Sequence, residues 1–281
     1  MSVSVSGPKA QEPRPEKRVG LLAGNGQFPV LFSHAAKSKG MEVFAVAYQG
    51  QANEELALHV DCIQWLYMGE VERILRFFTE NAITDVVMLG GIAKVQMFAD
   101  LKLDAMAIEI LSALKSTADD AVMRAFADFL EKKGLRVRPS TWLLPELLAP
   151  AGCWTKRGLT DQEAQDVAFG HDLAKKIGEL DIGQCLVVAK GSVLAVEAID
   201  GTDATIRRGG GLGNGNAVVI KICKPNQDRR FDLPSVGLET VRTMHESGAM
   251  ALALDAGVSV VFDREEMVRF ADSHGMAIVG V

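Results

Sequence analysis

Short apolar runs alternate with longer amphipathic stretches through the first half of the chain. Each short run is typical of a buried strand, and each longer stretch places apolar residues three or four positions apart, as on one face of a helix. Strands alternating with helices predict an α/β fold with a doubly wound, mostly parallel, Rossmann-like sheet, whose ligands bind beyond the carboxyl ends of its strands. The expected strands are 18–23, 42–47 and 84–89, and the expected helices are 28–40, 70–79, 105–114 and 119–133.

Two glycine turns follow strands of this sheet. Gly24-Asn25-Gly26-Gln27 leads from the first strand into a helix, and Gly90-Gly91 ends the third strand. Exposed amides at a helix N-terminus favour negative charge, so both turns are candidates for contact with a phosphate or a sugar. The first turn lacks the third glycine of a dinucleotide fingerprint, and no Gly-Lys-Ser/Thr follows it. Purely structural turns therefore remain an equal alternative. Lys94, one turn after Gly91, could reach a phosphate, and a solvated helix charge is an equal alternative for it.

A change of composition divides the chain. The segment Pro150-Ala151-Gly152 follows a short strand at 135–138 and an apolar segment at 142–148, and it is the expected boundary between two domains. The N-terminal residues are polar and offer almost nothing to bury, which predicts a disordered tail. The expected divisions are a tail at 1–17, a Rossmann-like domain at 18–150 and a second, mixed α/β domain at 151–281.

The second domain mixes hairpin and alternating patterns. Thr160 to Glu163 form a capping box that starts a helix running to about residue 178. His171, on that helix, is expected at the surface unless a charged partner lies beside it. Strands at 185–189 and 192–197 are joined by Lys190-Gly191, which favours a tight hairpin. The remaining expected elements are a strand at 217–222, a helix at 248–255, a strand at 258–262, a helix from 264 and a strand at 277–279.

Composition narrows the class of protein. The chain has 281 residues, of which 48% are hydrophobic and 23% charged, as in ordinary globular proteins. A net charge of -6 argues against a nucleic-acid binder. The four cysteines lack CxxC spacing and are expected as buried free thiols rather than zinc ligands. No apolar run reaches the roughly 18 residues that span a bilayer, and no signal peptide opens the chain, so a cytoplasmic location is expected.

Charged residues crowd into the stretch from Val196 to Asp232. Its carboxylates are Glu197, Asp200, Asp203, Asp228 and Asp232, and its basic residues are Arg207, Arg208, Lys221, Lys224, Arg229 and Arg230. Carboxylates this dense need partners, protonation or a cation, and Mg²⁺ suits oxygen ligands. The basic residues would then serve an anionic ligand, which points to phosphoryl or diphosphate chemistry. The alternative is a solvated ion-pair network on one face of a sheet.

Several motifs together resemble one known family. They are Leu22 to Pro29, Leu180 to Gln184, Val193 to Ala204, Lys224-Pro225 and Arg230 to Thr240. These segments are similar to those of the magnesium-dependent UDP-2,3-diacylglucosamine diphosphatases of lipid A synthesis, over nearly the whole chain from Arg18 to Val281. The resemblance implies Mg²⁺-dependent hydrolysis of that glycolipid nucleotide to UMP and 2,3-diacylglucosamine 1-phosphate, in a cleft between the two domains. It also implies transient contact with the inner membrane surface, while monomer and homodimer both remain open.

The resemblance assigns roles to individual residues. Asp232 is the expected catalytic residue, either as a Mg²⁺ ligand or by orienting the attacking water, with Asp203 as a second metal candidate. Glu197 and Asp203 are the next catalytic candidates. The residues expected to contact substrate are Gly24, Asn25, Gly26, Gln27, Gly90, Gly91, Asp120, Lys190, Thr202, Arg207, Lys221 and Arg230. Asp120 also has a purely structural explanation in the first turn of a helix.

Two segments depart from the family pattern, and other functions stay open. The departures are Ile92 to Gln96 and a short loop expected at Gly209 to Asn216.

A non-catalytic nucleotide-sugar or lipid-phosphate binding protein is the main alternative function. A nicotinamide oxidoreductase is disfavoured because Tyr48-Gln49-Gly50 offers no acidic residue after the second strand. The side chains that could meet the acyl chains, or else form core, are Phe98, Leu101, Leu103, Met106 and Ile108.

Overall fold

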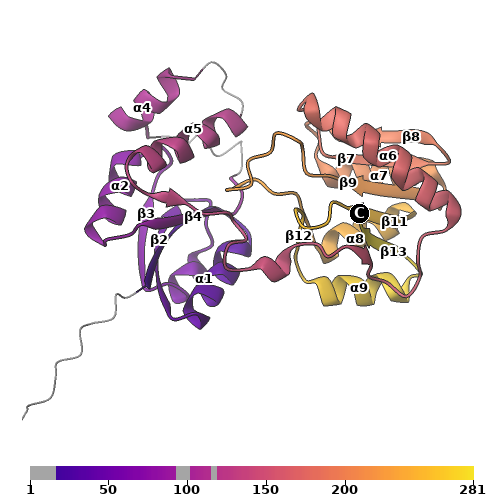
Figure 1. The fold of residues 1–281 in the computed structure, drawn as a ribbon, viewed down its shortest axis with the longest axis horizontal. Helices are drawn as coiled ribbons and strands as arrows, with labels where there is room; N and C mark the ends of the chain where they lie inside the picture. Colours follow the sequence, from indigo (N-terminus) through magenta and orange to yellow (C-terminus); the bar gives the residue numbers. More distant parts are fainter. Residues whose placement is uncertain (1–16, 93–101, 115–118) are drawn as a thin grey trace, which may run out of the picture. The chain divides into compact units, whose positions relative to one another are not determined.

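The computed structural model describes residues 17–92, 102–114 and 119–281, with the side chains of residues 119 and 120 outside the description. The chain divides into two compact units, Met1–Arg138 and Pro139–Val281 (Figure 1). The predicted Lys94, Phe98 and Leu101 lie outside the described residues. The apolar segment at 142–148, expected in the first domain, belongs to the second unit. There Leu148 bridges to Val260, and the Ala149 N–H donates to the Ser259 carbonyl at 2.8 Å.

The first unit is built on a five-stranded parallel sheet in the order β3-β2-β1-β4-β5. Its strands are β1 (Lys17–Ala23), β2 (Met41–Tyr48), β3 (Cys62–Leu66), β4 (Asp85–Leu89) and β5 (Arg136–Val137). The chain moves outward from β1 in one direction through β2 and β3, and then in the other through β4 and β5. The predicted doubly wound, parallel sheet is therefore confirmed.

Helices cover this sheet, and their apolar positions supply its core. They are α1 (Phe28–Ser38), α2 (Val71–Glu80), α4 (Ala105–Ser112) and α5 (Asp119–Lys132), with a 3₁₀ turn, η1, at Glu54–Leu58. Val71, Ala107, Ile110 and Phe129 form one buried cluster among α2, α4 and α5. Since right-handed crossovers in opposite directions lie on opposite faces of a sheet, α1 covers the other face.

The second unit contains a mixed six-stranded sheet in the order β6-β13-β11-β9-β7-β8. Its strands are β6 (Gly152–Cys153), β7 (Cys185–Ala189), β8 (Ser192–Val196), β9 (Ala217–Lys221), β11 (Ala249–Leu254) and β13 (Ala277–Gly280). A separate parallel pair joins β10 (Ser235–Val236) to β12 (Val260–Val261). The pairings of β7 with β8 and β9 are antiparallel, whereas β9, β11 and β13 run parallel. The expected mixed α/β character is confirmed.

Both faces of this second sheet are buried. The helix α6 (Asp161–Glu179) packs Val167 and Ala174 against one face. The other face is covered by α7 (Thr202–Gly213), α8 (Leu238–Ser247) and α9 (Arg264–Ser273), and a 3₁₀ turn, η2 (Pro145–Leu147), precedes β6. None of the helices in the described ranges is both long enough and apolar enough to cross a membrane.

The predicted helix at 248–255 is wrong, because this segment forms the central strand β11. Its alanines, methionine and leucines favour a helix in isolation. In the sheet, Leu252 and Leu254 face one core, while Ala251 and Ala253 face the other. Gly248, with φ of 80°, already ends the helix before it. Burial on both faces overrides local propensity here.

The predicted loop at Gly209 to Asn216 is also wrong, because residues up to Gly213 complete the helix α7. Gly209 and Gly210 lie inside this helix, where a side chain would collide with the neighbours. An added Cβ would lie 2.5 Å from the Val187 Cβ at Gly209, and 2.6 Å from the Ser247 Cβ at Gly210. The glycines allow close packing rather than a turn. Sequence reasoning also missed β3 and α8.

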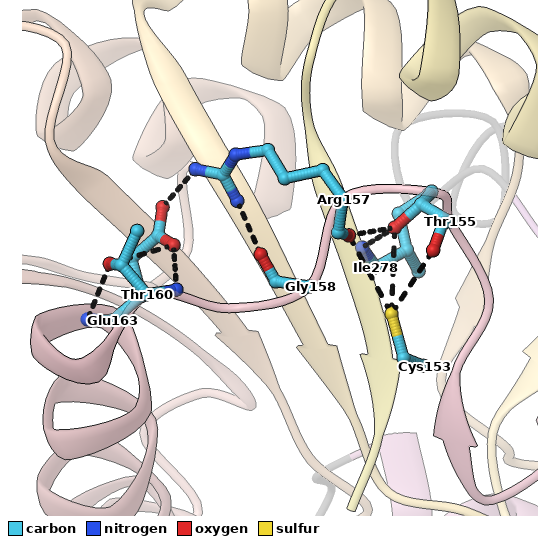
Figure 2. Close-up of polar contacts among 7 residues, drawn as sticks. All are labelled: Cys153, Thr155, Arg157, Gly158, Thr160, Glu163 and Ile278. Atoms are coloured by element: carbon cyan, nitrogen blue, oxygen red, sulfur yellow. Dashed lines mark hydrogen bonds and ion pairs between the residues drawn. The ribbon is translucent and has the colours of Figure 1, made fainter.

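The capping box that begins α6 is confirmed, and an arginine reinforces it. The Thr160 hydroxyl accepts from the Glu163 N–H at 3.3 Å, and the Thr160 N–H donates to the Glu163 carboxylate at 2.8 Å. Figure 2 shows that Arg157 also reaches this carboxylate, at 2.6 Å, while Thr155 ties the same segment to the Ile278 N–H. This segment is therefore fixed to both α6 and β13.

Candidate functional site

The carboxyl ends of several strands meet at one edge of the second sheet. Glu197 follows β8 directly, Lys221 ends β9, and Asp255 follows β11. The register places Cys185, the first residue of the antiparallel β7, opposite Lys221. This edge therefore collects charged side chains from segments far apart in the sequence, at the position where α/β sheets bind ligands.

The Glu197 carboxylate is buried and held in a fixed orientation. Its Oε1 accepts from the Thr202 hydroxyl at 2.8 Å, and its Oε2 accepts from the Gln184 N–H at 3.2 Å. The backbone of Gly183 lies so close that an added Cβ would be 2.1 Å from the Glu197 carbonyl oxygen. Glu197 thus organises the strand ends, and Gly183 is required for that close approach.

Lys221 carries a buried ammonium group without an ion-pair partner among the described residues. Its side chain donates to the Thr202 hydroxyl at 3.1 Å and to the Ser235 carbonyl at 2.9 Å. The residue is only 7% exposed. Since a buried cation is costly unless a counter-charge compensates it, this position suits an anionic ligand. The structure therefore brings together three predicted residues, Glu197, Thr202 and Lys221.

A deeply buried thiol lies beside this network. Burial raises the pKa of Cys185 to about 12, with the Lys221 charge acting in the opposite direction. The thiol is therefore protonated at neutral pH and serves as a packing group. Cys223 is also buried, as predicted, whereas Cys153 is exposed and Cys62 intermediate. The expectation of four buried thiols is thus wrong for two of them, which lie on the short edge strand β6 and on β3.

The N-terminus of α7 adds an uncapped set of backbone amides. The helix starts at Thr202 after Gly201, whose φ of 81° excludes most other residues, and no side chain caps it. Asp203 and Arg207 are exposed one helical turn apart, and neither side chain forms a hydrogen bond or an ion pair with a described residue. The amides and Arg207 can attract an anion, while the Asp203 carboxylate can accept from a hydroxyl or bind a cation.

The loop after β9 carries the predicted catalytic aspartate. The Arg230 guanidinium pairs with Asp228 at 2.7 Å, so Asp228 neutralises a neighbouring charge. The Asp232 N–H donates to the Asp228 carbonyl at 2.9 Å, which closes a turn before Pro234. At the start of the loop, Lys224 forms an ion pair with Asp181 at 2.7 Å.

Two glutamines that sequence reasoning missed attach this loop to the Glu197 network. Gln227 is buried, and its amide donates to the Gln184 side-chain oxygen at 3.2 Å. Gln227 also accepts from the Lys224 N–H at 2.9 Å. Gln184 lies inside one of the family-like motifs, but nothing in its local pattern indicates a partner 43 residues away.

The two glycine turns of the first unit lie directly against each other. The Asn25 N–H donates to the Gly91 carbonyl at 2.8 Å, and the Gly91 N–H donates to the Asn25 carbonyl at 3.1 Å. An added Cβ at Gly24 would lie 2.3 Å from the Gly91 carbonyl oxygen, and one at Gly90 would lie 2.4 Å from the Asn25 carbonyl oxygen. Close backbone approach therefore accounts for these glycines, while exposed Gly26 and Gln27 lead into α1.

Other predicted residues lie elsewhere or outside the description. Lys190 sits in the β7–β8 turn with φ of 51°, followed by Gly191 with φ of 72°, which confirms the tight hairpin. At about 3.3 Å per residue, the length of β7 separates Lys190 from Cys185 by ~17 Å. Asp120 is in the first turn of α5, and its side chain is not described. Leu103 and Ile108 are exposed near α4, whereas Met106 is partly buried.

His171 has the charged partner that sequence analysis left open. Its Nε2 lies 2.7 Å from the Asp255 carboxylate.

A separate surface cavity of about 520 Å³ is lined by Cys153, Trp154 and Arg264 among others, and by none of the predicted site residues. The predicted residues that the structure brings together thus lie at the strand edge and not at this cavity.

No group of three or more His, Cys, Asp or Glu side chains within the described ranges is placed to hold a metal ion. Mg²⁺ is often bound by one or two carboxylates, with substrate phosphates and water completing its shell. Of the two expected metal ligands, Asp203 is exposed in the first turn of α7, and Asp232 lies in the loop after β9, so the expectation is a sparse donor set of this kind rather than a complete protein cage.

The chain matches two family models and a curated relative. Residues 18–147 match the LpxI N-terminal domain, and residues 150–279 match the LpxI C-terminal domain. The UDP-2,3-diacylglucosamine pyrophosphatase LpxI of Caulobacter vibrioides is 32% identical over 276 residues, covering 94% of this chain and 98% of the relative.

Solved structures show more distant similarity. A biotin carboxylase domain of a thermophilic 2-oxoglutarate carboxylase, bound to ADP, is 16% identical with a TM-score of 0.27, over 63% of this chain and 35% of that one. An ADP complex of N5-carboxyaminoimidazole ribonucleotide synthetase is 15% identical with a TM-score of 0.28, over 72% and 46%. The chain spans less than half the length of either. Because two family models together match almost all of the described sequence, the chain belongs to the LpxI family.

Proposed function

We propose that this protein hydrolyses the diphosphate bond of UDP-2,3-diacylglucosamine, releasing UMP and 2,3-diacylglucosamine 1-phosphate in lipid A biosynthesis. Family membership and the activity named for the Caulobacter relative support this proposal. A water oxygen would form a bond to one phosphorus while the bond from that phosphorus to the bridging oxygen breaks. The leaving phosphate takes the bond electrons, and the proton lost by water passes to a base or to solvent.

The observation that carries the proposal is the buried Lys221 ammonium group at the strand edge. A diphosphate would supply a direct ion-pair partner, whereas among the described residues the ammonium group reaches the Glu197 carboxylate only through the Thr202 hydroxyl. Developing negative charge on the phosphoryl oxygens is stabilised by fixed donors that need no reorganisation. Arg207 and the first amides of α7 would add to this stabilisation, while Glu197 keeps Thr202 in place.

Asp232 is the proposed catalytic carboxylate. It would either orient the attacking water or hold Mg²⁺ beside the diphosphate, with Asp203 as a second metal ligand. Mg²⁺ bound there would neutralise phosphate charge and polarise a phosphorus–oxygen bond. The neighbouring Asp228 has a different role, because it forms the ion pair with Arg230.

A transient contact with the inner membrane surface follows from the proposed lipid substrate. Three aliphatic side chains support it, at the end of the sheet where β7 begins and β8 ends. Ile199 is 99% exposed, Leu180 72% and Ile182 50%. Gly183 and Glu197 are in close contact, which brings the two loops that carry these side chains together. Protruding aliphatic groups of this kind can enter the lipid surface.

The experiment incubates the full chain with UDP-2,3-diacylglucosamine, with Mg²⁺ or with EDTA, and identifies products by mass spectrometry. We expect UMP and 2,3-diacylglucosamine 1-phosphate in equal amounts with Mg²⁺, and neither with EDTA. Retention of intact substrate without hydrolysis would instead support a non-catalytic nucleotide-sugar or lipid-phosphate binding protein. Hydrolysis undiminished by EDTA would contradict the proposed role of Mg²⁺, but not the proposed hydrolysis itself.

A further inference from the structure

A second charge cluster lies at the same strand edge, in which a buried carboxylate contacts two partly exposed basic side chains. Asp255, 5% exposed, follows β11. Its Oδ1 is 2.7 Å from the His171 Nε2, and its Oδ2 accepts from the Lys175 ammonium group at 2.5 Å. His171 and Lys175 are four residues apart on α6, so one face of that helix presents both groups to Asp255.

The same cluster binds the backbone of Cys223, near the start of the loop that carries Asp232. The Cys223 N–H donates to Asp255 Oδ2 at 2.7 Å, and the Cys223 carbonyl accepts from Lys175 at 3.0 Å. Both backbone polar groups of Cys223 therefore bind this cluster instead of a neighbouring strand. One turn further along α6, an added Cβ at Gly178 would lie 3.3 Å from the Lys224 side chain and 3.4 Å from that of Pro225.

Electrostatics indicate that this end of the loop lies near Asp232. Burial is the main cause that raises the pKa of the Cys223 thiol, and the charges of Arg229 and Asp232 also act on it. For Asp255, burial alone would raise the pKa. Hydrogen bonds from Lys175, His171 and the Cys223 N–H outweigh burial and lower the pKa below its ordinary value. The Asp255 carboxylate is therefore ionised at neutral pH.

Stability alone does not require such an arrangement. A buried ion pair is often no more stabilising than well-packed apolar residues of similar volume, so its value can lie in fixing one geometry. Here the geometry that it fixes is the exit of β9 into the loop. By contrast, Asp166, 1% exposed, accepts from the Lys190 and Gly191 N–H groups and so fixes the hairpin turn at the far end of β7.

We propose that Asp255, together with Lys175 and His171, is a positioning cluster that holds the start of the Cys223–Pro234 loop and thereby places Asp232 for hydrolysis. This inference rests on the proposed function, because it assigns the loop a catalytic task. None of the three side chains needs to touch substrate. A shift of about 1 Å in a positioned catalytic group can cost about 100-fold in rate, so loosening Cys223 should be visible in turnover.

The test compares Lys175→Met and Asp255→Asn with Asp166→Asn, a buried carboxylate that fixes a turn away from the loop. We expect the first two to lower kcat by about 10- to 100-fold with KM changed less than about threefold. Lys175→Arg, which keeps the charge and donors, should recover most of kcat. Asp166→Asn should keep kcat within about threefold of wild type, even if it lowers thermal stability as much as Lys175→Met and Asp255→Asn do.

Hydrogen exchange of peptides covering residues 223–234, measured on the same variants, needs no turnover. Faster exchange in Lys175→Met and Asp255→Asn than in Asp166→Asn is the expected result. Wild-type exchange and kcat in folded Lys175→Met would overturn the positioning role, as would an equal loss of kcat in Asp166→Asn at equal stability. If the wild-type protein hydrolyses nothing, the proposed function fails, while the exchange data still decide whether the cluster holds the loop.

Discussion

Lys221 is a single residue whose buried charge suggests a functional role. Its donors meet only a hydroxyl and a carbonyl among the described groups. Retaining a charge where burial opposes it makes sense if an anionic ligand completes the site.

We predict that Lys221→Met lowers kcat/KM for UDP-2,3-diacylglucosamine by about 100-fold in a protein that still folds, because the diphosphate loses a charged donor. Steady-state kinetics and thermal unfolding together check this. Lys176→Met, which removes an exposed charge from α6, is the matched control and should behave as wild type. An Lys221→Met protein with wild-type kcat/KM would show that the ammonium group does not serve the substrate.

Asp85 provides a test of electrostatics in the first unit. Its carboxylate pairs with Arg136 at 2.7 Å and with Arg138 at 2.5 Å. Burial alone would raise its pKa, but hydrogen bonds from these arginines lower it below the ordinary value. Stabilisation is therefore complete above the unfolded pKa, near 3.9, and is lost as pH falls through the lower folded pKa.

We expect wild type to lose about 1 kcal/mol more unfolding free energy between pH 6 and pH 3 than Asp85→Asn does, a value reduced by the exposure of Arg136. Urea titrations at both pH values measure this difference. Equal losses in the two proteins would mean that the ion pairs add nothing to stability.

Single residues also show how far sequence reasoning reaches. Glu197, Thr202 and Lys221 could be singled out because they lie in one charged stretch and in family-like motifs, and the structure joins them. The contact of His171 with Asp255 spans 84 residues, and it exists only because α6 packs beside the end of β11. No local pattern carries that information, so it could not have been predicted.

At the scale of elements, α7 shows how packing changes the meaning of glycine. Three consecutive glycines weaken a helix and predict a loop. Two of them lie against Val187 and Ser247, whereas Gly211 has nothing within 4 Å of an added Cβ. The strand β11 also shows packing overriding local propensity, since a helix-favouring sequence becomes a strand when both of its faces are buried.

The pair Gly209→Ala and Gly211→Ala tests this account within one helix. Gly211→Ala should raise the unfolding free energy by about 0.5–1 kcal/mol, because alanine favours helix over glycine. Gly209→Ala should lower it by about 1–3 kcal/mol, because its methyl group would collide with Val187. Denaturant unfolding checks both changes. Stabilisation by both substitutions would contradict the close contact between α7 and β7.

The whole molecule consists of two units with separate sheets and cores. The α/β alternation of the first unit was predictable because each βα unit is local in sequence. The order of strands in the second sheet was not, since β9 pairs with both an earlier antiparallel strand and a later parallel one. Long-range pairing of this kind is decided by burial of the assembled faces.

Because the second unit has its own core on both sheet faces, we expect residues 139–281 to fold alone. The isolated fragment should unfold in one cooperative transition, followed by circular dichroism during heating, with dispersed amide signals in NMR spectra. A fragment with native-like secondary structure but no cooperative transition would show that its core depends on the first unit.

The most direct test of the central claim is the turnover of UDP-2,3-diacylglucosamine by wild type, Asp232→Asn and Asp228→Asn, followed by release of UMP in the presence of Mg²⁺. We predict a loss of about 1,000-fold or more in Asp232→Asn, with the substrate still bound, because the catalytic carboxylate is gone. Asp228→Asn removes a neighbouring carboxylate that pairs with Arg230 and should lose much less. Wild-type turnover in Asp232→Asn, or no release of UMP by the wild-type protein, would contradict the account.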